Sequence, residues 1–200
     1  MSSAVGFYET EKPGVLDRDY RARVSGLNSF DVVRPLHGHL AAAAPDATFL
    51  QKITYMDLHV RLPELLLMRV DKMSMAHSLE VRVPFLDKKL IEFAMRAPDA
   101  WKLRRGIPKE PVKKLAAAYA PQEIIYKPKQ GFGAPLQQWF AGDLRSLLED
   151  VLLSKDAAAY FDTGVLREKM NTGVATSRGA FQLWTMLNFI LWKNIVLDSA

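Results

Sequence analysis

The sequence predicts a mainly α-helical chain, and three observations indicate this fold class. Apolar residues recur at helical spacing in segments separated by Gly- and Pro-containing loops. A stretch near the C-terminus is apolar around most of a helical circumference, which is typical of a buried helix. The sequence shows no convincing series of parallel β-strands and no internal repeat.

The composition is that of an ordered globular chain. It has 200 residues, enough for one domain, with 49% apolar and 24% charged residues. The absence of cysteine excludes a disulfide scaffold, a Cys-based zinc site and a Cys nucleophile. The net charge of +5 suits anionic ligands such as ATP, pyrophosphate or nucleic acid, and it equally suits a solvated surface. Because no signal peptide or apolar run of about 18 residues is present, we expect a cytoplasmic protein without a membrane span.

The first part of the chain is weakly patterned. Gly and Pro punctuate residues 1–46, and we expect an irregular N-terminal segment of loop and short helices there, followed by the main part at 47–200. Asp46 is the expected N-cap of a helix over Thr48–Val60, because its carboxylate can accept a free N–H of the first turn. A second helix is expected to begin at Pro63 and to continue to His77, since proline suits the first helical position.

Further elements follow in order. The segment Glu80–Pro84 alternates polar and apolar residues, which predicts a short extended connector. The segment Lys127–Pro135 is expected to be a loop because of its Gly and Pro content. Helices are expected at Lys88–Arg96, Val112–Tyr119, Leu136–Phe140, Leu144–Leu153, Gly164–Met170 and Arg178–Leu197.

Two carboxylates lie in the predicted helix that begins at Pro63. Glu64 and Asp71 are seven residues apart, and seven steps of about 100° bring them within about 20° of one face. Carboxylates on an apolar helix either pair with cations for structure or position a cationic or protonated substrate. Spacing alone favours structural pairing and leaves catalysis open.

A gapless run of eighteen residues in this region resembles a family signature. VDKMSMAHSLEVRVPFLD, at Val70–Asp87, is similar to the V-D-R-M-S-M-A-x-x-L-E-x-R-V-P-F-L-D signature of the asparagine synthase family. Gly106-Ile107-Pro108-Lys109 resembles the family's Gly–Lys turn into a helix, and Lys127-Pro128-Lys129-Gln130-Gly131-Phe132 resembles its R-x-K-x-G-F segment. GAFQLWTMLNFILWKNIV is similar to its closing Trp-rich helix, so the resemblance covers about residues 50–197.

The resemblance implies the fold and the chemistry. The chain is expected to be the helical C-terminal portion of an adenine-nucleotide α-hydrolase-like (α/β) synthetase domain of a glutamine-hydrolysing asparagine synthetase. Such an enzyme uses ATP and Mg²⁺ to adenylate the side-chain carboxylate of aspartate, and ammonia derived from glutamine then displaces AMP. Cations must stabilise the negative charge that develops on the departing pyrophosphate.

The resemblance also assigns candidate residues for catalysis. Lys129 matches the family's lysine that contacts the phosphates and the acyl-adenylate, and its alternative is a solvated loop lysine. Lys109 is the second candidate on the phosphate side, with the same alternative. Lys127, which stands where the family has arginine, and Gly131 belong to the same substrate-binding and phosphate-binding segment. Glu64 lies near the carboxylate that takes the ammonia proton; alternatively, it is an acid stabilised by a helix N-terminus.

The signature itself supplies further polar residues. Asp71, Glu80, Arg82 and Asp87 are expected to form a buried ion-pair network that holds the pocket wall, with Asp71 and Arg82 also candidates for direct substrate contact. Pro84 joins Glu80 and Asp87 as a structural part of the signature. We expect no metal site built from protein ligands, because the four histidines show no metal-binding spacing.

The sequence also departs from the family. It contains no S-G-G-x-D-S loop, whose backbone N–H groups would hold pyrophosphate, and no G-E-G-x-D-E segment for magnesium. The chain alone is therefore not expected to synthesise asparagine, whether it is a fragment, a truncated gene product or one part of a split enzyme. A partner chain with the missing half is expected. Without that half, apolar helix surface is expected to be exposed and to favour a homo-oligomer.

Other functions stay open at this point. One is an amidotransferase relative that acts on a different carboxylate, for instance in a surface-polysaccharide or peptide natural-product pathway. Another is a non-catalytic interaction module that keeps the family fold. Nucleic-acid binding is suggested by charge alone and is not expected, because the basic residues do not cluster with aromatic residues in a known motif.

Overall fold

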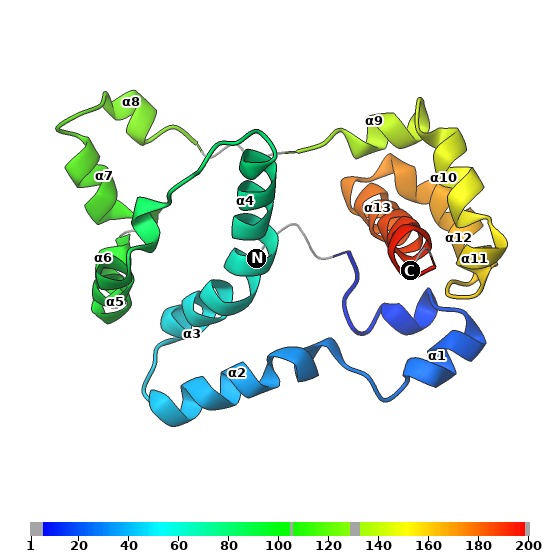
Figure 1. Ribbon diagram of the computed structural model, residues 1–200, viewed down its shortest axis with the longest axis horizontal. Coiled ribbons are helices and arrows are strands. Elements are labelled where there is room, and N and C mark those ends of the chain that lie inside the picture. The colour runs from blue at the N-terminus through cyan, green and yellow to red at the C-terminus, as the bar shows by residue number, and fades with distance from the viewer. Residues whose placement is uncertain (1–5, 105, 129–132, 199–200) are drawn as a thin grey trace. The chain divides into compact units, whose positions relative to one another are not determined.

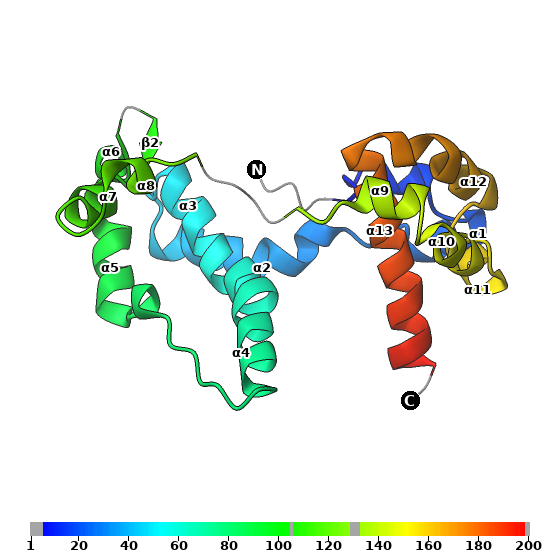
Figure 2. The same ribbon diagram turned by 90° about the horizontal axis from the view of Figure 1, so that it is seen from above.

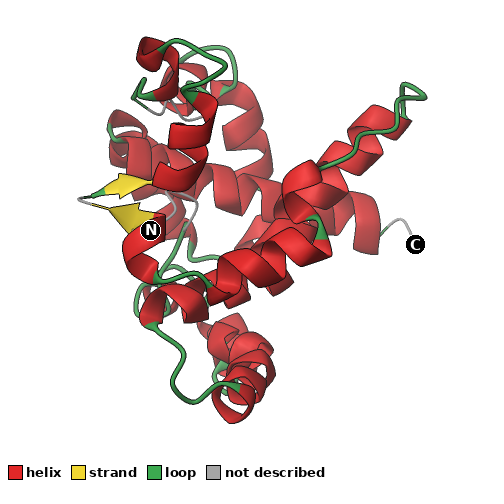
Figure 3. Ribbon diagram, turned by 90° about the vertical axis from the view of Figure 1, so that its left-hand side faces the viewer, coloured by secondary structure: helices red, strands yellow, loops and turns green. Residues whose placement is uncertain are grey.

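The computed structural model describes residues 6–104, 106–128 and 133–198. The chain divides into two compact units (Figure 1). We call Met1–Ser29 with Gly131–Ala200 the core unit and Phe30–Gln130 the signature unit. Helices dominate both units, and the strands among the described residues form one short antiparallel pair (Figure 3), so the predicted mainly α fold class is confirmed.

The core unit is built from helices at the two ends of the chain. Its elements are η1 (Lys12–Gly14), α1 (Arg18–Val24), α9 (Leu136–Ala141), α10 (Arg145–Leu152), α11 (Lys155–Ala158), α12 (Thr163–Thr172), η4 (Gly173–Ala175), α13 (Ser177–Trp192) and the π-helical η5 (Lys193–Leu197). The helices expected after residue 135 are confirmed, with ends that shift by one or two residues or, at the C-terminus, continue as a π-helix.

Helix α13 forms the centre of the core unit. Leu183, Met186, Leu187 and Ile190 are almost completely buried and pack with side chains of α9, α10 and α12. Full burial of one such side chain contributes roughly 1.5–3 kcal/mol. The expectation of a buried closing helix is therefore confirmed.

The N-terminal segment is attached to this core by backbone and side-chain contacts. The Asp17 N–H donates to the Tyr160 carbonyl at 2.9 Å, and the Asp162 N–H donates to the Val15 carbonyl at 3.0 Å. The Arg178 guanidinium donates to both oxygens of Glu11 at 2.7 Å. The backbone N–H of Tyr8 and the Arg178 guanidinium lower the pKa of Glu11, which keeps this clamp charged.

The signature unit contains shorter elements. They are α2 (Ser29–Ala43), which begins at the last residue of the core unit, α3 (Phe49–Met56), the π-helical η2 (Asp57–Leu67), α4 (Met68–Met75), η3 (Pro84–Leu86), α5 (Lys88–Arg96), α6 (Asp99–Lys102), β1 (Leu103–Arg104), β2 (Ile107–Pro108), α7 (Glu110–Ala116) and α8 (Gln122–Ile125). The prediction for α5 is confirmed at both ends.

Two expectations for this unit are wrong. Helix α2 is longer than the short helices expected before residue 46, and it contains Pro35. The cap of α3 is Thr48 in place of Asp46, because the Thr48 hydroxyl accepts from the Gln51 N–H while the Gln51 side chain accepts from the Thr48 N–H. The expected division of the chain at residue 46 stays a prediction.

A third correction concerns Pro63. It does not begin a new helix, because α3, η2 and α4 follow one another without a break and Pro63 lies inside the π-helical part. The Met68 N–H bonds to the Pro63 carbonyl five residues earlier, as in a π-helix. A proline ring clashes with the carbonyl four residues before it in an α-helix, and the wider π turn changes this geometry.

The signature unit buries little apolar surface. Among its described residues, Leu40 is the one buried hydrophobic side chain. Most of the large hydrophobic side chains that are exposed belong to this unit, including Phe49, Met73, Leu79, Phe85, Phe93, Leu115 and Ile124. The expectation of exposed apolar helix surface is confirmed, and self-association stays a prediction.

Candidate functional site

The run from α3 to α4 carries the two acids singled out by the sequence. Glu64 follows Pro63 in the π-helical η2, and Asp71 lies in the first turn of α4. Both residues are exposed. Among the described residues, neither carboxylate forms an ion pair, so structural pairing of these acids is not observed in that part of the chain.

The expected alignment of Glu64 with Asp71 does not apply. It was based on an uninterrupted α-helix with about 100° of rotation per residue. The π-helical turns rotate less per residue, and they extend from Asp57 to Leu67, past Glu64. The sequence did not indicate this segment, because Pro63 was expected at the first position of a new helix and lies instead inside the π-helical part.

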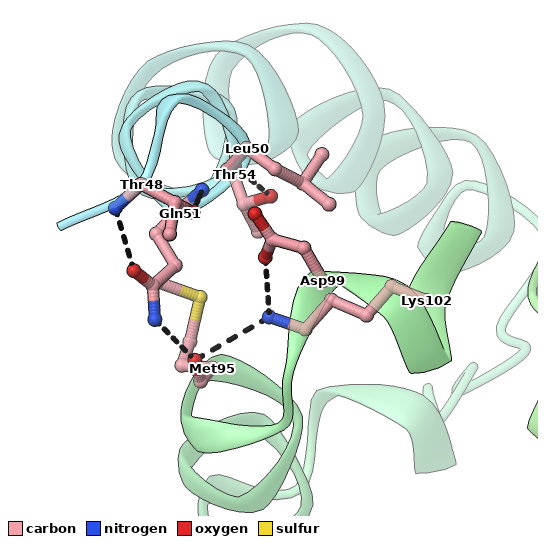
Figure 4. A network of polar contacts seen from close by, with 7 residues as sticks. All are labelled: Thr48, Leu50, Gln51, Thr54, Met95, Asp99 and Lys102. Atoms are coloured by element: carbon pink, nitrogen blue, oxygen red, sulfur yellow. Dashed lines mark hydrogen bonds and ion pairs between the residues drawn. The ribbon is translucent and has the colours of Figure 1, made fainter. Parts of the chain in front are cut away.

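A polar network attaches the start of this helical run to α5 and α6 (Figure 4). The Gln51 side-chain amide donates to the Met95 carbonyl at 3.0 Å, and the Lys102 ammonium donates to the same oxygen at 3.4 Å. Lys102 also lies 3.8 Å from the Asp99 carboxylate. The sequence Thr48-x-x-Gln51 is a capping-box pattern, which predicts the hydrogen bonds between these two residues. No sequence pattern predicts the contact of Gln51 with Met95.

The same network connects to Lys109. The Lys109 N–H donates to the Lys102 carbonyl at 3.0 Å, beside the β1–β2 hairpin in which Leu103 faces Pro108 and Arg104 faces Ile107. The helical run that carries Glu64 is therefore bonded through Gln51 to the Met95 carbonyl, and the turn that carries Lys109 is bonded to Lys102, whose ammonium donates to the same carbonyl. Among the described residues, no hydrogen bond or ion pair joins Glu64 directly to Lys109.

Lys109 itself has an unusual backbone. Its φ of 61° and ψ of 31° lie in the left-handed region, which costs a non-glycine residue of order 1–3 kcal/mol. Lys109 directly precedes α7, and the Lys113 N–H donates to its carbonyl at 3.0 Å. The expected Gly–Lys turn into a helix is thus present, with Gly106 at φ 77° in the hairpin.

Neighbouring cations have partners, whereas Lys109 has none within the described ranges. Glu110 lies 3.7 Å from Arg104 and 3.4 Å from Lys114. The Lys113 ammonium lies 5.0 Å from the centroid of the Tyr126 ring. The exposed Lys109 ammonium can therefore meet an external anion without first breaking an ion pair to a described residue.

The signature segment after α4 is exposed, so the expected buried ion-pair network is wrong for this chain. Arg82 and Glu80 do form an ion pair, but their side chains are 84% and 67% exposed. Asp87 is instead the N-cap of α5 and accepts from the N–H groups of Lys89 at 3.0 Å and Leu90 at 3.2 Å. Pro84 begins η3. These residues have no covering layer within the described chain.

The loop that carries the principal lysine is described only in part. Lys127 is exposed after α8, at the end of the range 106–128. Lys129 and Gly131 lie outside the described residues. The expected convergence of Lys129, Lys109 and Glu64 on one reaction centre stays a prediction.

A shallow pocket of about 550 Å³ lies in the core unit, lined by residues that include Gln138, Arg145 and Met170. The Arg145 guanidinium already donates to the Met170 carbonyl at 2.7 Å and to Glu149 at 2.5 Å. None of the predicted site residues lines this pocket.

The ranges 6–104, 106–128 and 133–198 hold no group of three side chains suited to bind a metal ion. Their helices are also too short or too polar to cross a bilayer.

Comparison with known proteins gives one family. A sequence model of the family described as asparagine synthase matches residues 7–194. Asparagine synthetase 1 (glutamine-hydrolyzing) of Bacillus subtilis (strain 168) is 29% identical over 151 residues, which cover 75% of this chain and 24% of the relative. A putative asparagine synthetase (glutamine-hydrolyzing) of Mycobacterium bovis is 31% identical over 172 residues, which cover 85% of this chain and 26% of the relative.

The chain thus spans about a quarter of the length of these relatives. No solved structure matches it.

Proposed function

The chain belongs to the asparagine synthase family, and from that membership we propose that it supplies the helical part of an active site that makes asparagine from aspartate, ATP and ammonia. The observation that carries the proposal is the family match over residues 7–194, which extends through both units. The gapless signature at Val70–Asp87 adds residue-level support.

The proposed reaction has two steps. An oxygen of the aspartate side-chain carboxylate attacks the α-phosphorus of ATP, and the bond to pyrophosphate breaks. Ammonia then attacks the activated carbonyl carbon, loses a proton and displaces AMP. A carboxylate needs this activation because its oxygen is otherwise a poor leaving group, and cations must stabilise the pyrophosphate charge.

Lysines are the proposed ligands of the phosphates. Lys109 supports this role because its ammonium is exposed and forms no ion pair with a described residue, while the backbone of its turn is fixed through Lys102. Lys127, Lys129 and Gly131 lie in the second lysine-bearing segment, and their part in the proposal rests on the family resemblance of that segment.

Glu64 is the proposed base for the ammonia proton. A base is required because nitrogen carries an extra proton after it attacks a carbonyl carbon. Two observations support the role: the carboxylate is exposed, and it has no cation among the described residues that would hold it in a structural ion pair. Its position in a π-helical segment agrees with the frequent use of such segments at functional sites.

The proposed site needs residues that lie outside this sequence. No S-G-G-x-D-S loop for pyrophosphate and no Cys for glutamine hydrolysis occur among the 200 residues. We assign these parts to a further polypeptide segment, in the same or another chain, which also supplies ammonia from glutamine. The exposed apolar side chains of the signature unit support such a cover, because apolar surface of this kind marks an interaction site.

The experiment combines the 200-residue chain with a polypeptide that carries the S-G-G-x-D-S loop and measures pyrophosphate release. Release is expected to require aspartate, ATP and both polypeptides. Lys109→Ala and Lys129→Ala are expected to lower the rate by about 10²–10³-fold, the usual cost of losing one group that stabilises developing charge. Lys114→Ala is the matched control, since Lys114 is paired with Glu110. Equal rates for Lys109→Ala and Lys114→Ala would contradict the assignment.

Two alternatives give other outcomes in the same assay. Pyrophosphate release that depends on a different carboxylate would indicate an amidotransferase relative. Stable association of the two polypeptides without pyrophosphate release from any carboxylate would indicate a non-catalytic interaction module, which the exposed apolar surface of the signature unit also favours.

A further inference from the structure

The connector Leu79–Val83 has the features of a β-strand without a neighbour. It runs as a loop from α4 to α5 within the signature unit (Figure 2). Its apolar residues Leu79, Val81 and Val83 alternate with Glu80 and Arg82, and all five are exposed. Residues two apart lie on the same side of an extended chain, and the ion pair of Glu80 with Arg82 shows this arrangement directly.

Backbone hydrogen bonds hold the two ends of the connector. The Leu79 N–H donates to the Ser74 carbonyl at 3.0 Å, and the Leu86 N–H donates to the Val83 carbonyl at 2.9 Å. Within the described part of the chain, the N–H and C=O groups of Glu80 and Arg82 have no hydrogen-bond partner. In an extended strand these groups of residues 80 and 82 point to one edge, and those of residues 79, 81 and 83 point to the other. The edge of Glu80 and Arg82 is therefore open.

We propose that this edge pairs with the same segment of a second copy of the chain, antiparallel and centred on Val81. In this register Glu80 of each copy faces Arg82 of the other, so two opposite-charge pairs form. The open N–H and C=O groups of Glu80 and Arg82 supply four hydrogen bonds between the copies. Val81 faces its own counterpart, and Leu79 faces Val83, on the apolar side of the ribbon.

Charge selects this arrangement over the others. Parallel pairing in register places Glu80 beside Glu80 and Arg82 beside Arg82, which is unfavourable. An antiparallel shift by two residues places one of these residues opposite its own kind, and a shift by one residue places both charges opposite apolar residues of the connector. The pairing is limited to five residues, because Ser78 has a left-handed backbone with φ 57° and Pro84 has no N–H to donate.

The interface is symmetric and small. An isologous contact of this kind forms a closed dimer and does not propagate. Five paired residues bury less than the about 1,200–2,000 Å² of a stable complex, so we expect a weak dimer that is best detected by covalent trapping. The inference does not depend on the proposed enzymatic function, because the contact is tested by cross-linking and not by activity.

Cysteine trapping tests the proposal, since the chain has no cysteine of its own. In the proposed register the two residues at position 81 form a close non-hydrogen-bonded pair with Cα atoms about 4.5 Å apart, within disulfide range. Val81→Cys is therefore expected to give a disulfide-linked dimer under mild oxidation. Val70→Cys is the matched control, because Val70 on α4 and Val81 are each 44% exposed. It is expected to cross-link at least tenfold more slowly.

Charge variants in the Val81→Cys background test the register. Glu80→Arg and Arg82→Glu each place like charges in opposition and are expected to lower the cross-linking rate several-fold. A mixture of these two variants restores both opposite-charge pairs, so a mixed dimer is expected to cross-link at the original rate. The double variant Glu80→Arg/Arg82→Glu also restores both pairs and is expected to cross-link with itself at that rate. Equal cross-linking at Val70 and Val81, or no recovery in the mixture, would overturn the proposal and assign the open edge to the completing part of the synthetase.

Discussion

The core unit and the signature unit differ in what they do with their apolar side chains. In the core unit, Leu148, Leu166, Leu183 and Ile190 are completely buried around α13. In the signature unit, most of the residues that match the family signature are exposed, together with many large apolar side chains. The core unit closes on itself, whereas the signature unit presents a surface to be covered, and that surface carries the residues assigned to chemistry.

Contacts between distant parts of the sequence show the same difference. The core unit joins residues 6–17 to the C-terminal helices by backbone hydrogen bonds and by the Glu11–Arg178 pair. Within the C-terminal part, Tyr160 packs edge to face on Phe189 with ring centroids 5.1 Å apart. In the signature unit, the network around Gln51, Met95 and Lys102 supplies polar contacts with little apolar packing. Regions with few buried contacts open at lower free energy.

The largest expected difference between the units comes from truncating a leucine in each. Leu183→Ala removes a side chain with 0% exposure and is expected to lower the free energy of unfolding by about 2–5 kcal/mol, through lost burial and a cavity. Leu115 in the signature unit is 69% exposed, and Leu115→Ala is expected to change the free energy of unfolding by less than about 0.5 kcal/mol. Urea unfolding followed by tryptophan fluorescence measures both, in a Trp101→Phe background whose remaining tryptophans lie in the core unit. Equal effects would remove the distinction between the units.

Glycine substitutions sharpen the comparison at the next level. A Cβ at Gly179 would lie 2.2 Å from the Gly173 carbonyl oxygen, so Gly179→Ala forces a backbone shift and is expected to cost about 1–3 kcal/mol. A Cβ at Gly38 in α2 meets nothing within 4 Å, and Gly38→Ala is expected to stabilise this helix by about 0.5–1 kcal/mol. Thermal unfolding followed by circular dichroism shows whether each substitution raises or lowers the stability. A neutral Gly179→Ala would contradict the close packing of η4 on α13.

Helix caps of the same chemistry occur in both units and differ in context. Asp162 caps α12, where its carboxylate accepts from the Val165 N–H, and Asp87 caps α5, where its carboxylate accepts from the N–H groups of Lys89 and Leu90. Asp162→Ala is expected to lower the unfolding free energy of the core unit by about 1 kcal/mol. Asp87→Ala is expected to leave that value unchanged and to increase amide exchange in α5. A loss of core-unit stability in Asp87→Ala would show that the two units unfold together.

Acid is expected to loosen the N-terminal clamp of the core unit. The Tyr8 N–H and the Arg178 guanidinium lower the pKa of Glu11 below its ordinary value of 4.5. A carboxylate with a lowered pKa in the folded state stabilises that state fully above the ordinary pKa and loses this contribution as the pH falls through the lowered value. Proteolysis of residues 6–17 is therefore expected to accelerate below pH 4.5. In the Glu11→Gln variant, residues 6–17 should be cleaved faster at neutral pH, and the pH dependence that Glu11 causes should be lost. A cleavage rate with the same pH profile as in the unaltered chain would contradict the role of Glu11.

The sequence predicted elements best where local signals and burial agree. Helices α5, α10 and α13 were predicted at or near their ends, because their apolar residues follow helical spacing and the buried face of α13 is wide. The π-helical η2 was missed because Pro63 was assigned to the start of a helix. The expected N-cap of α3, Asp46, was also wrong, although Thr48 and Gln51 form a capping-box pattern in the sequence.

The candidate site was less predictable, for physical reasons. The left-handed backbone of Lys109 depends on the hairpin that precedes it, and that hairpin has only two residues in each strand. The ion pairs expected at Asp71, Glu80, Arg82 and Asp87 were assigned to a buried network, but burial requires a covering layer that the described chain does not contain. Sequence patterns show that a face is apolar, and they do not show which polypeptide covers it.

Hydrogen exchange of the 200-residue chain, with and without a polypeptide carrying the S-G-G-x-D-S loop, tests the contrast between the units most directly. We expect slow amide exchange in α13 under both conditions. In α4 and α5 we expect much faster exchange than in α13, and this exchange is expected to slow when the completing polypeptide is added. Equal and strong protection of α4, α5 and α13 in the chain alone would contradict the account, because the signature unit would then be stable without a cover.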